Sequence, residues 1–225
     1  MSTPTPRRAV PERSGAQTVC RAIELLRLGM EAGGAGLTLR EATALTGWSK
    51  SSVHRLLAEL AAGGLLLRAP GRAYVLGRFA HELGLTPSPL GELQDLCAQA
   101  LARIRTETCG TVFLGMRSGT SSVCVDYALG DDVRPPIVPP RGSLRPLGVG
   151  AAGLAVLSWL RDEEVETIGA RNQRRMAAYG GRFDGRLMAM VRQARSDGFA
   201  RVANIVEPGV VGIGACIADP VGTPL

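Results

Sequence analysis

The stretch 38-TLREATALTGWSKSSVHRLLAELAAGGLLLRAPGRAYVLGR-78 decides the fold of the first part of this 225-residue chain. Its apolar spacing predicts two short helices joined by a tight turn and followed by a small β-hairpin. The second helix, expected at about 49–60, has an apolar stripe at positions i, i+3, i+4 and i+7. The stripe consists of Val53, Leu56, Leu57 and Leu60. This is the pattern of a helix-turn-helix.

The residues at the ends of the two helices agree with this pattern. Thr38 and Glu41 have the spacing of a capping box, which marks the start of the first helix. Gly47 provides the turn between the helices, and Gly63-Gly64 stops the second helix. The inner face of the first helix and the closure of the core beneath it are expected to come from Leu39, Ala42, Leu45 and Trp48.

A hairpin is expected after the second helix. Residues 65–68 and 74–76 read as two strands around the turn Ala69-Pro70-Gly71-Arg72, where Pro followed by Gly is a turn signal. Arg68 and Arg72 lie at the tip, where a wing could touch a phosphate backbone. The sequence therefore predicts a winged helix-turn-helix.

The face of the second helix opposite its apolar stripe is short, polar and basic. At about 100° per residue, Ser51 and Arg55 lie opposite the stripe, and Ser52 and His54 lie on its flanks. Lys50 stands near the helix start and is the only lysine of the chain. Such a helix can enter a DNA major groove. Two other interpretations remain open, a purely structural helical hairpin and a winged fold that contacts another protein.

The charge distribution favours a nucleic-acid partner for this part of the chain. Residues 1–80 carry 11 Lys and Arg against 5 Asp and Glu, whereas residues 81–225 carry 15 of each. The whole net charge of +6 thus lies in the segment that holds the helix-turn-helix. This asymmetry is expected when one domain faces phosphate and the other does not.

Composition also bears on the compartment. No apolar run is long enough to span a membrane, and the N-terminus lacks the apolar core of a signal peptide. The cysteines are five in number and scattered, so they fit neither a disulfide framework nor a zinc site. The sequence predicts a soluble cytoplasmic protein without a bound metal.

Four segments are expected along the chain. Residues 1–14 are predicted to be a disordered basic arm, which is either a solvated tail or an extension that reaches DNA. Residues 15–79 form the winged domain, and a helix at 16–31 packs there through a stripe of Val19, Ile23, Leu26 and Met30. Residues 80–91 are a linker with a short helix at 79–83, and residues 92–225 form a second domain.

The second domain is predicted to be α/β. It opens with a long amphipathic helix whose inner face is Leu93, Leu96, Cys97, Ala100, Leu101 and Ile104. Two strands joined around Ser118-Gly119-Thr120 follow, and then a proline-rich loop. Helices are expected at 151–160, 162–169 and 187–197, and the chain finishes with strand-like segments. This order suggests a mostly antiparallel sheet, so the whole chain is α+β.

From about Gly15 the chain resembles the IclR family of transcriptional regulators. The stretches that match are WSKSSVHRLLAEL, the wing ending in YVLG, then GSLRPLGVGAAG, DGFA and EPGVVGIGACIAD. The resemblance implies a homodimer or homotetramer that binds a partly palindromic operator on double-stranded DNA. It also implies a C-terminal GAF-like effector domain that senses a small metabolite, often aromatic or carboxylate-bearing. It implies no cofactor and no enzymatic activity.

The resemblance implies two sets of site residues, assigned from their positions in the matching motifs. The DNA contacts would come from Lys50, Ser51, Ser52, His54, Arg55 and Arg72. The effector pocket would be lined by Ile137, Arg145, Ala151, Ala152, Val202, Val210 and Gly212. The residues give an independent reason for the second site, because the small side chains of Gly150–Gly153 leave the amides of a helix start accessible to an anion. The other interpretation is that these small residues only permit close packing.

The chain departs from the family in three ways: at two residues near the start of the 151–160 helix, in the segment 202–205, and at its C-terminal end. Gly148 stands where the family usually has His, and Leu154 where it often has Lys or Arg. Residues 202–205 are Val-Ala-Asn-Ile, where the family often has acidic side chains. A more apolar pocket is therefore expected. The last residues, DPVGTPL, come where the family continues into another strand and a helix, so the C-terminal end is expected to be truncated.

Two rival functions are open at this point. Gly148–Gly153 reads GVGAAG, which matches the dinucleotide fingerprint, but it follows a proline-rich loop instead of a buried strand. A thiol-based redox sensor could use Cys109 or Cys216, although neither has a cationic partner or a second thiol adjacent in sequence. Both histidines, His54 and His81, lie in or beside the winged domain, which leaves the second domain without an imidazole base.

Overall fold

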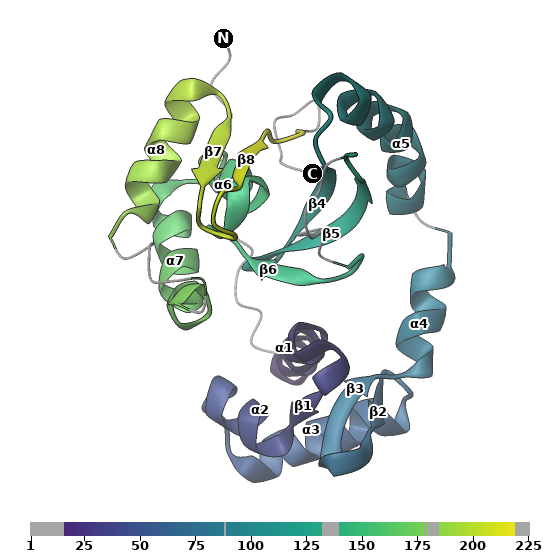
Figure 1. The fold of residues 1–225 in the computed structure, drawn as a ribbon. Coiled ribbons are helices and arrows are strands. Elements are labelled where there is room, and N and C mark those ends of the chain that lie inside the picture. Colours follow the sequence, from purple (N-terminus) through teal and green to yellow (C-terminus); the bar gives the residue numbers. More distant parts are fainter. Residues whose placement is uncertain (1–15, 88, 132–139, 178, 180–184, 219–225) are drawn as a thin grey trace. The chain divides into compact units, whose positions relative to one another are not determined.

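The computed structural model describes residues 16–87, 89–131, 140–177, 179 and 185–218. The chain forms two structural units that meet in sequence at Gly91 and Glu92 (Figure 1). The predicted arm at 1–14 and the pocket residue Ile137 lie outside the described residues. In the described part of the chain, no helix is long and apolar enough to cross a membrane.

The N-terminal unit is a winged helix-turn-helix. Its elements are α1 (Gln17–Ala32), β1 (Leu37–Thr38), α2 (Leu39–Thr46), α3 (Lys50–Ala62), β2 (Leu66–Arg68), β3 (Ala73–Leu76) and α4 (Arg78–Leu85). The strands form an antiparallel sheet in the order β1-β3-β2, with Leu37 opposite Tyr74 and Leu67 opposite Val75. The predicted helices of the helix-turn-helix and the hairpin after them are confirmed.

The predicted helix ends are formed by the expected residues. Thr38 donates its backbone N–H to Glu41 Oε2 at 2.9 Å, and its hydroxyl accepts the Glu41 N–H at 3.2 Å. Two hydrogen bonds from Thr38 lower the pKa of the Glu41 carboxyl; the hydroxyl has the larger effect and the backbone N–H the smaller. Gly47 ends α2 in the left-handed conformation, with φ of 69°. The capping box and the turn are therefore confirmed.

The core of the N-terminal unit lies behind α3. Its buried residues are Leu25, Leu37, Ala42, Val53, Leu56, Leu57, Leu60, Leu66 and Tyr74, and Trp48 packs against them. The predicted stripe of α3 is thus fully buried, and burying each such side chain stabilises the fold by about 1.5–3 kcal/mol. The predicted place of Leu45 is wrong, because its side chain is 61% exposed on α2.

The predicted inner face of α1 is only partly correct, because Leu26 packs against the N-terminal core but two other predicted members are exposed. Val19 and Ile23 are 58% and 44% exposed, whereas Leu25 and Gly29 are buried. At Gly29 the helix meets β2, where an added Cβ would lie in ordinary van der Waals contact, 3.5 Å from Leu66 Cδ2. Glycine has no side chain to mark a buried position in the sequence. The spacing of the large apolar side chains of α1 therefore predicted a face next to the one that is buried.

In its described residues, the C-terminal unit combines four helices with two small sheets. Its elements are α5 (Pro89–Thr108), β4 (Val112–Ser118), β5 (Ser121–Ala128), β6 (Leu144–Pro146), α6 (Gly150–Ser158), α7 (Asp162–Ala177), α8 (Leu187–Asp197), β7 (Ala200–Ala203) and β8 (Val211–Gly214). The strands pair antiparallel in the orders β4-β5-β6 and β7-β8. An α+β chain with an antiparallel second domain is confirmed.

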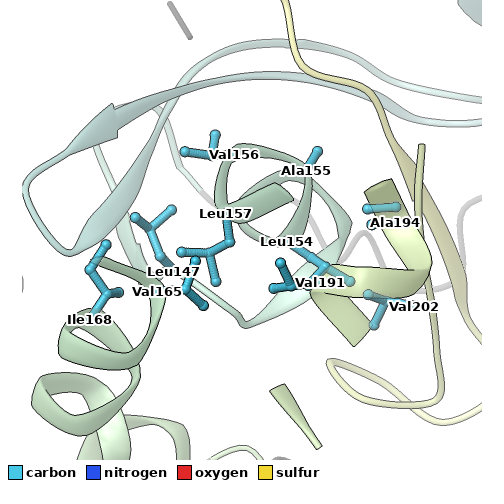
Figure 2. Packing of buried hydrophobic residues seen from close by; sticks show 11 residues of the cluster. Leu147, Leu154, Ala155, Val156, Leu157, Val165, Ile168, Val191, Ala194 and Val202 are labelled. Atoms are coloured by element: carbon cyan, nitrogen blue, oxygen red, sulfur yellow. The ribbon is translucent and has the colours of Figure 1, made fainter. Parts of the chain in front are cut away.

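Helix α6 lies at the centre of this unit. Its residues Leu154, Ala155, Val156 and Leu157 are all buried, so the helix is covered on nearly every side. Figure 2 shows these residues together with Leu147 from the segment after β6, Val165 and Ile168 from α7, Val191 and Ala194 from α8 and Val202 from β7. The start of α6 is therefore held in a fixed place by the surrounding elements.

Two predictions for this unit need correction. Helix α7 continues to Ala177, eight residues beyond the predicted end, because Asn172 and Met176 extend its buried face. The predicted stripe of α5 is only partly correct, since Leu101 is buried as expected, but Leu96 is 77% exposed and Ile104 is exposed as well.

Polar side chains attach α5 to the sheet. Gln94 donates to the Val125 carbonyl at 3.1 Å, and Arg105 donates to the Leu129 carbonyl at 2.6 Å. Arg105 also forms an ion pair with Asp131. This side of α5 contacts the sheet through polar side chains, so the spacing of apolar residues could not predict it.

Candidate functional site

The polar face of α3 is exposed. The side chains of Lys50, Ser51, His54 and Arg55 are exposed, and Ser52 is half-buried. All of them stand on the helix whose other side carries the buried stripe of the N-terminal core. A rigid helix with a free polar face is the geometry that major-groove recognition requires.

The start of α3 carries three serines that interact with one another. Ser49 is the N-cap, and its hydroxyl accepts the Ser52 N–H at 3.3 Å and donates to the Ser52 hydroxyl at 2.8 Å. The Ser51 hydroxyl lies 3.3 Å from that of Ser49. Ser49 is not among the DNA-binding residues that the resemblance implies. A serine immediately before a segment with helical apolar spacing is nevertheless a recognisable N-cap signal.

The wing carries its arginine in an unusual backbone conformation. The turn between β2 and β3 contains Pro70, Gly71 and Arg72, and Gly71 and Arg72 have φ of 78° and 64°. A left-handed residue with a side chain costs about 1–3 kcal/mol. The bond from the Ala69 N–H to the Ala73 carbonyl at 2.8 Å closes the turn. The side chains of Arg68 and Arg72 are both exposed.

Within the part of the N-terminal unit that the structure describes, no carboxylate neutralises these basic groups. Among the described residues, neither Lys50 nor Arg55, Arg68 or Arg72 takes part in an ion pair. Arg78 differs, because it pairs with Glu82 at 2.7 Å on α4. The cations of α3 and of the wing therefore remain available to an anionic partner.

The second candidate site lies at the start of α6. The N-cap residue Val149 makes no side-chain cap, and the first amides of a helix have no partner within the helix. A Cβ on Gly150 would lie 3.8 Å from Arg145 Nη1 and 3.6 Å from Val206 Cγ2. The half-buried Arg145 of β6 thus lies beside the positive end of this helix.

Strand β8 lies against the same helix start. A Cβ on Gly212 would lie 3.3 Å from the Ala151 Cβ and 3.9 Å from the Val202 carbonyl oxygen. Gly214 is closer still, since its Cβ would lie 2.6 Å from the carbonyl oxygen of Ala151. Four of the carried-over residues, Arg145, Ala151, Val202 and Gly212, therefore lie around one helix end.

Two further carried-over residues lie at the edge of this arrangement. The exposed Ala152 lies near β4, since a Cβ added to Gly115 would be 3.8 Å from the Ala152 Cβ. Val210 is exposed, and its carbonyl accepts the Asn204 N–H at 2.9 Å. Val206 also lies beside Gly150 but is not among the effector residues that the resemblance implies. It belongs to no recognised motif, and only the tertiary fold brings it close to Gly150.

The structure gives a packing reason for the glycine at 148. Gly148 is buried with φ of 98°, and a Cβ there would lie 3.0 Å from Leu187 Cδ1 and 3.2 Å from Met176 Cε. A histidine there would have to displace the ends of the Leu187 and Met176 side chains and adopt a backbone conformation that favours glycine. Leu154 is likewise buried in the core around α6.

The rival functions receive no support. The GVGAAG stretch follows β6, which is antiparallel to β5, and α6 leads directly into α7. The described elements around it therefore do not form the parallel βαβ unit of a dinucleotide site. All five cysteines are free thiols, and burial raises the pKa of both Cys124 and Cys216, which lowers their reactivity. Within the described ranges, no cluster of His, Cys, Asp or Glu could hold a metal ion.

Comparison with known proteins adds the following. A family model for the IclR helix-turn-helix domain matches residues 18–70. The HTH-type transcriptional regulator KipR of Bacillus subtilis (strain 168) is 32% identical over 151 residues, which are 67% of this chain and 59% of KipR. The chain thus spans less than two thirds of the length of this relative.

Solved structures share the fold of both units. An IclR family transcriptional regulator from Brucella abortus has a TM-score of 0.71 at 20% identity, and the match covers 93% of this chain and 79% of that chain. An IclR homolog from Microbacterium hydrocarbonoxydans in complex with 4-hydroxybenzoate has a TM-score of 0.61 at 16% identity, with 93% and 86% of the two chains covered.

Proposed function

Because the chain belongs to the IclR family of transcriptional regulators, we propose that it binds operator DNA through its N-terminal unit and that a small molecule bound by its C-terminal unit controls this binding. The observation that carries the proposal is the exposed polar face of α3, held from behind by four buried apolar side chains. Such a protein acts in the cytoplasm as a transcriptional regulator and not as an enzyme.

In this proposal, α3 lies in the major groove. Lys50 and the serines at the helix start bind phosphate oxygens, while His54 and Arg55, farther along the helix, reach base edges. Arg72 at the tip of the wing adds a backbone contact. Residues 15–79 act as the DNA-binding domain, 80–91 as the linker and 92–225 as the effector domain. The protein acts as a homodimer or homotetramer, so two copies of α3 match the two halves of a partly palindromic operator.

The effector site in this proposal is the start of α6. The Arg145 guanidinium and the first amides of the helix favour an anionic group, and Ala151, Val202 and Gly212 provide small or apolar surface beside it. Ile137, Ala152 and Val210 complete the proposed lining. The structure from Microbacterium hydrocarbonoxydans contains 4-hydroxybenzoate, which combines a carboxylate with an aromatic ring. We therefore propose a small aromatic or apolar carboxylate as the effector class.

Control of DNA binding requires that the effector has different affinities for two arrangements of the paired DNA-binding units. The arrangement with the matching half-site spacing binds the operator, and the effector shifts the population between the two. Coupling of this kind is typically about 1–3 kcal/mol.

The Arg55→Ala variant tests the DNA-binding part of the proposal. A duplex is selected from a random library by the full-length wild-type chain, and a scrambled duplex of the same composition serves as reference. If Arg55 contacts a base, binding of the selected duplex weakens by about 1–3 kcal/mol, and the preference over the scrambled duplex decreases. Fluorescence anisotropy at several salt concentrations measures both affinities.

Arg192→Ala is the matched control, because Arg192 is an exposed helical arginine of the C-terminal unit. It is expected to leave both affinities unchanged. An equal loss on both duplexes with a smaller salt slope would assign Arg55 to phosphate contact only. Unchanged binding in Arg55→Ala would contradict its assignment to the interface.

The effector part is tested by thermal unfolding with 4-hydroxybenzoate and with 4-hydroxybenzyl alcohol, which lacks the carboxylate. A ligand at 100 times its Kd stabilises the folded state by about 2.7 kcal/mol, which raises the melting temperature. The acid should stabilise the wild type more than the alcohol does, and Arg145→Ala should remove this difference. Arg201→Ala, an exposed arginine on β7, is the control that should retain it. Equal stabilisation by the acid and the alcohol would rule out recognition of the carboxylate.

A further inference from the structure

A cation–π pair lies directly before the start of α3. The guanidinium carbon of Arg21, on α1, is 5.0 Å from the centroid of the Trp48 ring. Trp48 packs against the N-terminal core on which α3 also rests. It immediately precedes Ser49, the N-cap of α3. A side chain of α1 is thus fixed beside the first residues of α3.

The cation–π contact places the Arg21 guanidinium over the Trp48 ring without an ion pair to any described residue. Arginine stacks on an aromatic face through its flat side, and its N–H groups lie in the plane of the guanidinium. The described residues include no carboxylate in an ion pair with Arg21, which is half-buried. A guanidinium that is already positioned loses less side-chain entropy when it binds an anion.

The place of this group relative to α3 identifies the anion. In a helix-turn-helix, the N-terminal residues of the second helix enter the major groove, and the phosphates of the groove edge pass beside that helix end. The positive end of α3 and the Lys50 ammonium lie at the same end. An anion that approaches the start of α3 therefore meets several positive groups.

We propose that Arg21 binds a DNA backbone phosphate beside the start of α3, with Trp48 as the platform that holds its guanidinium. This inference rests on the proposed DNA binding and adds a contact from α1, outside the helix-turn-helix and the wing. The contact is independent of base sequence, since it involves only phosphate oxygens.

The salt dependence of binding provides the test. Each lost phosphate contact reduces the slope of log K against log salt by about 0.9. The full-length Arg21→Ala variant should therefore show a slope smaller by about 0.9 for each bound protomer, on both the selected and the scrambled duplex. The ratio between the two affinities should remain that of the wild type.

Two further variants separate this contact from a structural role and from general charge. Arg21→Gln keeps a planar group over Trp48 but removes the charge, so it should show the same loss of slope even if Arg21→Ala is unstable. Arg27→Ala removes an exposed arginine elsewhere on α1 and should keep the wild-type slope. A merely structural role of Arg21 would lower the melting temperature without changing the slope.

The outcomes distinguish the two proposals. A wild type that selects no duplex would overturn DNA binding itself. A wild type that selects a duplex, together with Arg21→Gln at the wild-type slope, would overturn only the role of Arg21. Equal losses of slope in Arg27→Ala and Arg21→Gln would also overturn it, because the effect would then follow from total charge.

Discussion

The Leu57→Ala variant is expected to lose about 2–5 kcal/mol of unfolding free energy in the N-terminal unit. Leu57 is fully buried in the middle of α3, among Val53, Leu60 and Leu25 of the same core cluster. The substitution removes the packing of three carbon atoms and leaves a cavity that α1 and the sheet cannot fill without moving. Since α3 carries the proposed DNA contacts, binding of the selected duplex should weaken as the unit unfolds.

Urea denaturation followed by circular dichroism measures this loss, and Leu45→Ala is the matched control. Leu45 is the same residue type on the neighbouring α2, but its side chain is largely exposed, so its loss should stay within about 0.5 kcal/mol. If the two variants were equally stable, Leu57 would not be part of the core that supports α3.

The Asn172→Ala variant is expected to lose on the order of 2–4 kcal/mol in the C-terminal unit. The buried Asn172 amide donates to the Thr120 carbonyl at 2.7 Å and to the Leu147 carbonyl at 3.2 Å. It thereby links α7 to the β4–β5 turn and to the segment between β6 and α6. The Thr120 carbonyl also accepts the Leu147 N–H at 2.9 Å, so it keeps one bond, but alanine leaves the Leu147 carbonyl without the amide and opens a cavity.

The effect of Asn172→Ala should extend to the proposed effector site, because Leu147 lies three residues before the start of α6. We expect a lower melting temperature and a reduced stabilisation by 4-hydroxybenzoate. Gln173→Ala removes an exposed amide from the same helix and should change neither quantity. A variant with the wild-type melting temperature would show that the Asn172 amide contributes no net stability.

Sequence reasoning succeeded where the signal is local. The stripe of α3, the Thr38–Glu41 capping box and the turn at Gly47 depend on residues within one or two helical turns of each other. The polar face of α3 follows from the same geometry, because residues opposite a buried stripe are exposed. The helix-turn-helix and the hairpin could therefore be predicted from the sequence, whereas the packed face of α1 and the exposure of Leu45 could not.

The packed faces of α1 and α5 could not be predicted fully from periodicity, because small or polar groups form part of them beside Leu25 and Leu101. Helix α1 packs through Gly29, and α5 is attached through Gln94 and Arg105. Contacts between distant segments could not be predicted either. The approach of Val206 to Gly150 and the stacking of Arg21 on Trp48 result from the tertiary fold and have no pattern in the sequence.

The contact between β8 and the start of α6 has a consequence for how the range of effectors can evolve. At Gly212 and Gly214 the strand touches the helix with its main chain, and at Gly214 even a methyl group would meet backbone atoms. The floor of the proposed site is thus a main-chain surface that single substitutions cannot reshape gradually. New effector preferences would have to arise on the walls, through side chains such as Arg145 and Val206, while the floor stays the same.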